Sequence, residues 1–227
     1  MGTLFIVATP IGNLKDIGLR ALETLKEVDL ILCEDTRKTK NLLDVYGIKT
    51  SLLSYHQHSK IKKINEIIGY LEEGKNLALV SDAGTPGISD PGNFLISQLV
   101  GFFPQQNVSV IPGPSALAAA ASVSGFPMDK FLFLGFPPVK KRRKKFFEEI
   151  ARSDYPAIFY ESPYRIIKTL TELNSVLIEL NEEREVVVCR ELTKKFETIY
   201  RGKINEVVEK IKKETRGEFV VIVNKRE

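Results

Sequence analysis

The chain has 227 residues, of which 43% are hydrophobic and 27% charged, a composition typical of a globular protein that buries a core. No apolar run approaches the roughly 20 residues that a membrane helix requires, and the N-terminal stretch lacks the basic start of a signal peptide, so we expect neither. Cys33 and Cys189 each lie in an apolar run without a pattern of pairs, which indicates buried thiols in the reducing cytoplasm.

Charge is distributed unevenly between the two halves of the chain. Residues 1–115 contain 11 Lys and Arg against 12 Asp and Glu, whereas residues 116–227 contain 22 against 17. This asymmetry favours a polyanionic partner for the second half, although a modest excess of charge on a solvated surface explains the same counts equally well.

Short apolar runs alternate with helical patterns through the first half. The runs predict strands at Leu4–Val7, Val28–Cys33, Ser51–Tyr55, Leu77–Val80 and Val108–Ile111. Helices are expected between them: one capped by Asp16 and ending before Val28, one over Asn41–Tyr46, one opened by Ser59 and ended by Gly74, and one over Gly92–Phe102. This rhythm predicts a mostly parallel sheet covered on both faces.

After Ile111 the strands follow one another through shorter connections, which predicts a mixed sheet. The expected elements are an Ala-rich helix at Ser115–Val123, a basic helix, helices at Tyr164–Leu180 and Ile204–Lys213, and strands at Phe131–Gly135, Ala157–Tyr160, Val186–Cys189, Thr198–Arg201 and Phe219–Val223. We therefore expect an α/β protein of two domains, residues 1–114 and 115–227.

Three loops rich in Gly and Pro follow strands of the first half, at residues 8–13, 81–92 and 111–116. Loops at strand ends are where open α/β sheets bind ligands, and glycine lets backbone approach a ligand closely. The first loop lacks both G-x-G-x-x-G and a Walker lysine, so neither dinucleotide nor phosphate-loop chemistry follows from it. The loops favour a binding role over ordinary turns, and the second is the strongest because its length exceeds that of a plain connection.

Six segments together carry a family resemblance. They are Glu34–Arg37, Tyr55–His58, the loop Asp82–Gly92, Pro112–Ala116, Glu161–Arg165 and Arg190–Lys194. In this order they resemble the ribosomal RNA small subunit 2′-O-methyltransferase I family, a branch of the tetrapyrrole methylase superfamily, from residue 4 to about residue 223. Members of that family often continue well past the final strand, whereas this chain ends four residues after Val223; the further segment of those members is a candidate for contact with RNA or the ribosome.

The resemblance implies a tetrapyrrole-methylase-like fold with a parallel-sheet N-terminal domain, a mixed-sheet C-terminal domain and a cofactor cleft between them. It implies a homodimer that uses S-adenosylmethionine to methylate the ribose 2′-oxygen of a cytidine in 16S rRNA of the 30S subunit. The cofactor-binding positions carried over by the motifs are Pro10, Ile11, Asp82, Ala83, Thr85, Ser115, Ala116, Glu161, Thr193 and Gly217. For Asp82, capping its own loop is the alternative.

The candidates for the acceptor side come from the same motifs. Asp35, Arg37 and His56, with His58, are expected near the ribose hydroxyl, a weak acid that a base or a polarising cation would activate. The alternatives are a helix cap with an ion pair for Asp35 and Arg37, and a surface position for the histidines. Two histidines without further ligands at metal spacing make a poor metal site, so no metal is expected.

A run of six cations follows Pro137-Pro138 and opens the basic helix. It comprises Lys140, Lys141, Arg142, Arg143, Lys144 and Lys145. A helix face cannot pair six cations in sequence, so an RNA phosphate backbone is the expected partner and a solvated loop the alternative.

Two other functions compete with the rRNA methyltransferase. A corrin- or porphyrin-type methylase would act on a flat acidic substrate, against which the cationic run and the Glu34–Arg37 motif argue. A non-catalytic RNA-binding protein would not need the intact glycine loops.

Overall fold

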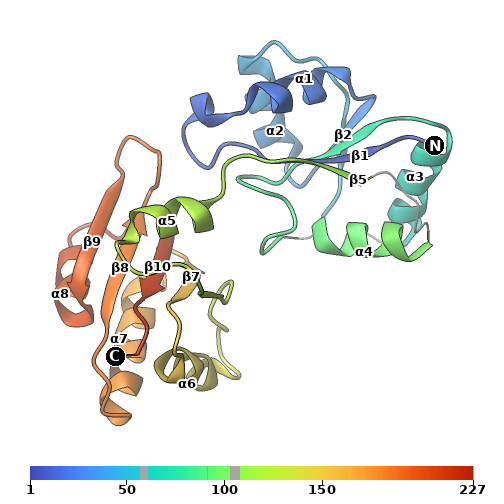
Figure 1. Cartoon of the computed structure of the whole chain (residues 1–227). Coiled ribbons are helices and arrows are strands. Elements are labelled where there is room, and N and C mark those ends of the chain that lie inside the picture. The colour runs from blue at the N-terminus through green and yellow to red at the C-terminus, as the bar shows by residue number, and fades with distance from the viewer. Residues whose placement is uncertain (57–60, 91, 103–107, 227) are drawn as a thin grey trace. The chain divides into compact units, whose positions relative to one another are not determined.

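A computed structural model of the chain describes residues 1–56, 61–90, 92–102 and 108–226. It divides into two compact units, Met1–Ser115 and Ala116–Glu227, each built on a sheet of its own (Figure 1). Ser59, expected to open a helix, and His58 lie outside the described residues. No helix in the described part of the chain is long and apolar enough to cross a membrane.

The first unit contains a fully parallel sheet, as the sequence predicts. Its five strands are β1 (Leu4–Val7), β2 (Leu30–Cys33), β3 (Leu52–Ser54), β4 (Leu77–Leu79) and β5 (Val108–Ile111), in the order β3-β2-β4-β1-β5. Leu4 of β1, an inner strand, is in register with Leu77 on one side and Val108 on the other. Because all five strands run the same way, the loops after them leave at one edge of the sheet.

Helices cover both faces of this sheet. The helices α1 (Leu19–Glu27) and α2 (Thr36–Val45) pack with one face, and α3 (Ile61–Glu72) and α4 (Gly92–Phe102) with the other (Figure 1). Alternate residues of β2 enter the two cores: Ile31 and Cys33 face α1 and α2, whereas Leu32 faces α3 and α4. The sheet is therefore apolar on both sides, which explains its continuous hydrophobic runs.

The starts of α1 and α2 differ from the prediction. Asp16 does not cap α1; it ends a 3₁₀ turn, Leu14–Asp16, and α1 follows Gly18 without a side-chain cap. Five residues before the predicted Asn41, α2 begins at Thr36, because the Asp35 carboxylate accepts a hydrogen bond of 2.9 Å from the Arg37 amide. The first turn of α2 carries no apolar residue, so apolar spacing did not reveal it.

The second unit contains the predicted mixed sheet. Its strands are β6 (Leu132–Phe133), β7 (Ala157–Glu161), β8 (Glu185–Arg190), β9 (Thr198–Lys203) and β10 (Phe219–Val223), in the order β6-β7-β10-β8-β9. The pair β6 and β7 is parallel, and the other three pairs are antiparallel.

Four helices complete this unit. They are α5 (Ala116–Ser124), α6 (Arg143–Arg152), α7 (Ile166–Glu179) and α8 (Ile204–Ile211). The last three share one core with the sheet, to which β10 contributes Phe219, Val221 and Val223. The Ala-rich α5 lies outside that core, against β10. Because side chains alternate along a strand, Val220 and Ile222 of β10 point to the face opposite that core.

The two cysteines are free and buried, one in each unit, as predicted. Burial raises the pKa of Cys189 to about 11, and it also raises that of Cys33. Both thiols are therefore protonated at neutral pH and unsuited to nucleophilic chemistry.

Candidate functional site

The three glycine loops of the first unit are tied to one another at the carboxyl edge of the sheet. The Thr9 amide donates to the Gly84 carbonyl at 2.9 Å, and the Gly84 amide returns a bond of 3.0 Å. The Thr85 hydroxyl donates to the Pro114 carbonyl at 3.1 Å. The loops after β1, β4 and β5, far apart in sequence, therefore form one continuous backbone surface.

Two glycines in this surface are required by geometry. Gly84 has φ of +83°, a left-handed conformation that L side chains rarely adopt. At Gly113, a Cβ would lie 3.0 Å from the Cβ of Ala8, so a side chain there would push the first and third loops apart. The glycine content of the loops thus serves their mutual packing.

The predicted cofactor positions of this unit fall into two groups. Pro10 and Ile11 are buried, and a Cβ on Gly84 would lie 3.4 Å from the Ile11 side chain. Asp82 and Ala83 are exposed, and Thr85 and Ser115 are half-buried; Ala116, also half-buried, is the first residue of the second unit. A ligand would therefore contact the second group and rest on loops that the first group supports.

Asp82 connects the second loop to the β2–α2 connection. Its Oδ1 accepts a bond of 3.3 Å from the Asp35 amide, and its Oδ2 pairs with Lys38 Nζ at 2.6 Å. Through these contacts Asp82, in the loop after β4, is bound to the segment that follows β2.

Asp35 and Arg37 form the helix cap and ion pair considered as the alternative to catalysis. In addition to the cap, Arg37 donates from Nε to Oδ1 at 3.1 Å and from Nη2 to Oδ2 at 2.9 Å. These bonds from the Arg37 side chain hold the pKa of Asp35 at about 2. Both carboxylate oxygens are engaged and weakly basic, so the geometry disfavours Asp35 as a proton acceptor.

Glu34, the preceding residue, has different surroundings. It is half-buried, and burial raises the pKa of its carboxyl; Asp82 and Asp90 raise that pKa further, against His56 and Lys38. It lines a small pocket whose wall comprises Glu34, Tyr55, Leu79, Val80, Ser81, Pro86, Asp90 and Gly92.

The sequence contained a signal that separates Glu34 from Asp35. Alternation along β2 continues past its end, so Glu34 follows Leu32 toward α3 and α4, and Asp35 follows Cys33 toward α1 and α2. Reading the motif as one charged block concealed this difference.

His56 is exposed beside the pocket, with Nδ1 3.3 Å from the Ser54 hydroxyl oxygen. Its charge also acts on Glu34. Among the described residues, no three His, Cys, Asp or Glu side chains gather in an arrangement that could hold a metal ion.

In the second unit, Glu161 is an interior residue with 2% of its surface exposed. Its Oε1 accepts from the Ser162 amide and pairs with Arg165, both at 2.7 Å, and its Oε2 accepts from the Thr169 hydroxyl at 2.6 Å. These contacts make Glu161 the centre of a buried polar network.

Arg143 belongs to the same network, which corrects its assignment to RNA. Its guanidinium donates to the Thr169 hydroxyl at 2.6 Å and the Pro138 carbonyl at 2.9 Å, and it pairs with Glu172. The other five cations, Lys140, Lys141, Arg142, Lys144 and Lys145, are exposed, although Lys144 also pairs with Glu179 at 2.8 Å. Because α6 begins at Arg143, the helix turns this residue inward and its neighbours outward.

Thr193 and Gly217 lie in two loops that pack together. Thr193 has φ of +65° and Gly217 has φ of +109°. A Cβ on Gly217 would approach the Glu191 Cγ to 2.5 Å, and Lys194 bridges Glu191 and Glu218 at 2.9 and 2.8 Å. Thr193 and Gly217 therefore lie close together, in loops that have unusual backbone conformations and are joined by ion pairs.

Comparison with known proteins identifies the family. The sequence profile described as Tetrapyrrole (Corrin/Porphyrin) Methylases matches residues 3–208. A Thermotoga maritima protein named ribosomal RNA small subunit methyltransferase I is 46% identical over 228 residues, covering 100% of both chains. A Bacillus subtilis protein of the same name is 46% identical over 227 residues, 98% of this chain and 75% of that protein.

Solved structures show the same fold at low sequence identity. The methyltransferase CobJ aligns with a TM-score of 0.70 at 20% identity, over 99% of this chain and 95% of that one. Uroporphyrin-III C-methyltransferase from Thermus thermophilus, complexed with S-adenosyl homocysteine, aligns with a TM-score of 0.66 at 17% identity, over 98% and 97%. The profile match and the full-length relatives show that this chain belongs to the tetrapyrrole methylase family and, within it, to the ribosomal RNA small subunit methyltransferases I.

Proposed function

We propose that the protein transfers a methyl group from S-adenosylmethionine to the ribose 2′-oxygen of a cytidine in 16S rRNA, acting on the 30S subunit in the cytoplasm. The observation that carries this proposal is the joining of the loops after β1, β4 and β5 at one sheet edge, in a chain whose relatives bear an rRNA methyltransferase name. Those names, with the exposed cations of the second unit, favour RNA over a tetrapyrrole as the acceptor.

The loop surface of the first unit suits a ligand of the adenosyl type. Asp82 and Ala83 offer exposed polar and backbone groups, and Thr85 and Ser115 offer half-buried hydroxyls beside them. The first amides of α5 follow Ser115 and have no partners inside their helix. When bound, the cofactor supplies a methyl group on a positively charged sulfur, which the Asp82 carboxylate complements.

We propose more limited roles for the cofactor positions of the second unit. Thr193 and Gly217 present backbone in unusual conformations, which suits direct contact with a ligand. Glu161 has its carboxylate engaged inside the unit, so its contribution is to hold the Ser162–Arg165 segment in place.

On the acceptor side, the Asp35–Arg37 pair holds the β2–α2 connection and leaves the Arg37 side chain 88% exposed. We propose that this guanidinium contacts an RNA phosphate and that His56 contributes positive charge at the same edge. Positioning of the ribose then supplies much of the rate acceleration.

We also propose that the protein acts as a homodimer. Light scattering of a solution at assay concentration would then give twice the chain mass of 25.6 kDa. A mass of one chain would remove the dimer from the proposal.

Calorimetry with S-adenosylhomocysteine tests the cofactor surface. We expect micromolar binding without added metal, weakened about tenfold or more by Thr85→Phe and by Ser115→Phe, whose rings would fill the space above the loops. Ser97→Phe, on the exposed side of α4, is the matched control and should bind normally. Unchanged binding in both loop variants would remove these loops from the site.

A further inference from the structure

Two polar side chains of the Glu34 pocket make no hydrogen bond of good geometry with the residues that the structure describes. The Tyr55 side chain is 1% exposed, and its hydroxyl makes no hydrogen bond within the part of the chain that the structure describes. Burial raises the pKa of Tyr55 and outweighs the opposite effect of the nearby Leu95 backbone, so the hydroxyl keeps its proton. The Glu34 carboxylate, half-buried, forms neither a hydrogen bond nor an ion pair with residues 1–56, 61–90, 92–102 or 108–226. A buried hydroxyl without a partner is costly to the fold, so a ligand is its natural partner.

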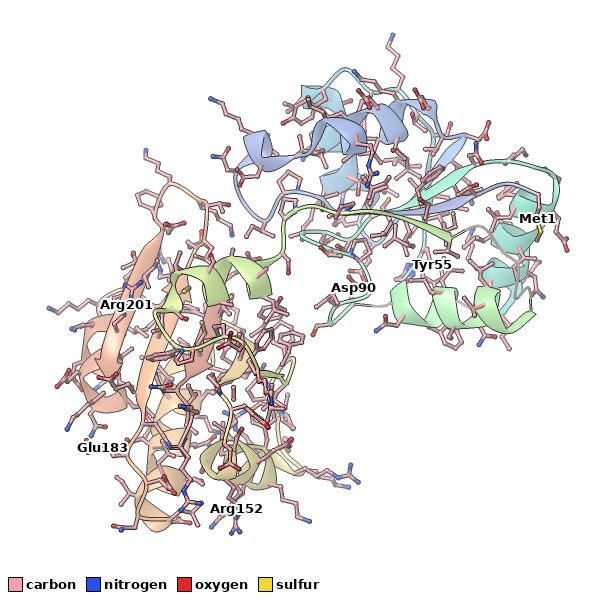
Figure 2. The ribbon with its side chains drawn as sticks, in the orientation of Figure 1. Met1, Tyr55, Asp90, Arg152, Glu183 and Arg201 are labelled. Carbon is pink, nitrogen blue, oxygen red and sulfur yellow. The ribbon has the colours of Figure 1, made fainter. Side chains whose placement is uncertain are left out.

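The other polar residues of the pocket wall are already engaged. The Ser81 hydroxyl donates to the Ala83 carbonyl at 3.2 Å. Asp90, labelled with Tyr55 in Figure 2, accepts on Oδ1 from the amides of Gly87 at 2.6 Å and Gly92 at 2.9 Å, which caps α4. Glu34 and Tyr55 are therefore the groups in this wall that are available to a ligand.

The size of the pocket limits what it can receive. The space open to the centre of a water molecule is about 10 Å³, which is room for one water-sized group. A nucleobase or a tetrapyrrole ring is too large. A hydroxyl fits and matches both side chains, because it can donate to the Glu34 carboxylate and accept from the Tyr55 hydroxyl.

We propose that this pocket is the acceptor site of the methyl transfer, in which Glu34 removes the proton of the ribose hydroxyl and Tyr55 holds its oxygen. The inference rests on the proposed function and specifies its chemistry. The O–H bond breaks and its proton passes to a Glu34 carboxylate oxygen. A lone pair of the ribose oxygen forms the bond to the methyl carbon, and the electrons of the carbon–sulfur bond remain on sulfur.

The surroundings of Glu34 suit this role. Burial and the carboxylates of Asp82 and Asp90 make it a stronger base than an ordinary glutamate, while His56 and Lys38 keep the charged form accessible. Asp35, the next residue, has the opposite properties.

The test combines activity, cofactor affinity and stability in four variants. Glu34→Gln should lower single-turnover methyl transfer to 30S subunits about a hundredfold or more, and Tyr55→Phe about tenfold, with S-adenosylhomocysteine affinity unchanged. In the protein without ligands, both variants should melt at or above the wild-type temperature, because neither removes a protein hydrogen bond.

Matched controls separate a binding role from a structural one. Tyr46→Phe removes a hydroxyl that donates to the Leu14 carbonyl at 2.5 Å, so it should lower the melting temperature and leave transfer intact. Asp44→Asn, on the exposed side of α2, should change neither.

The outcomes also separate this inference from the proposed function. Transfer by Glu34→Gln within threefold of wild type, or a lower melting temperature for Tyr55→Phe, would overturn the pocket assignment while the rRNA activity of the wild type stands. If the wild type methylates no 30S subunits, the proposed function fails, and the acceptor assignment fails with it.

Discussion

Glu34 and Asp35 show how far one position in a strand end changes the chemistry of a carboxylate. Asp35 turns toward the start of α2, where the Arg37 amide and side chain bind both of its oxygens. Glu34 turns to the other face, where burial and two further carboxylates oppose its ionisation. At this scale, the direction of the side chain separates the structural role of Asp35 from the catalytic role proposed for Glu34.

Asp35 is expected to act through the helix that it caps. Asp35→Asn keeps the cap and should retain most of the activity, whereas Asp35→Ala should lower the melting temperature by roughly 2–4 °C. Because the pKa of Asp35 is depressed to about 2, its ionised contribution to stability is present above about pH 4. Thermal melts should therefore show a deficit for Asp35→Ala that is constant at higher pH and shrinks as the pH falls toward 2. A hundredfold loss of turnover in Asp35→Asn with a normal melting temperature would instead indicate that Asp35 takes part in catalysis.

Arg143 is expected to stabilise the second unit and not to bind RNA. Arg143→Met keeps the packed stem and removes a guanidinium that contacts Pro138, Thr169 and Glu172, which should cost about 2–4 kcal/mol. Lys145→Met, two residues along the same helix but exposed, should change the free energy of unfolding by less than about 0.5 kcal/mol. Urea denaturation of the two variants measures both values, and equal stabilities would contradict the buried network.

At the scale of helices and strands, hydrophobic pattern predicted the strands better than the helix starts. The limits of β1 and β10 match the predicted runs, because a strand buried on both faces is apolar from end to end; the limits of β5 also match, although Val110 is exposed. The start of α2 was missed because its first turn, Thr36–Lys40, carries no apolar residue. The cap that fixes it depends on the direction of the Asp35 side chain, which apolar spacing does not report.

The role of the basic run can be tested by measuring RNA affinity at different salt concentrations. Four of its exposed cations form no ion pair within the part of the chain that the structure describes: Lys140, Lys141, Arg142 and Lys145. If three or four of them contact RNA phosphates, changing all four to Gln should flatten the log–log salt dependence of 30S affinity by roughly two to three units. Cofactor affinity should not change.

A control for total charge accompanies this variant. It changes four exposed lysines elsewhere in the second unit to Gln: Lys168, Lys210, Lys213 and Lys225. The same flattening in this control would show that net charge, and not the basic run, determines RNA affinity.

At the scale of the whole molecule, the sequence predicted the two sheets and the family, and it singled out three glycine-rich loops that the structure joins at one edge of the sheet. The sequence did not show which loop positions are buried and which are exposed to a ligand. Pro10 is buried and Asp82 is exposed, although both belong to the same kind of loop motif. It also assigned Glu161 and Arg143 to ligands, since a motif cannot show that two charged residues meet through Thr169 inside the second unit. Motifs therefore do not reveal contacts between residues that are distant in sequence.

The central claim is that this chain methylates a ribose oxygen of 16S rRNA, and transfer of labelled methyl from S-adenosylmethionine to unmethylated 30S subunits tests it directly. The account predicts label that is stoichiometric with the subunits, located on the 2′-oxygen of a cytidine, with no transfer to uroporphyrinogen or a corrin precursor under the same conditions. Label on a tetrapyrrole but not on 30S subunits, or on a base and not on a ribose, would contradict it.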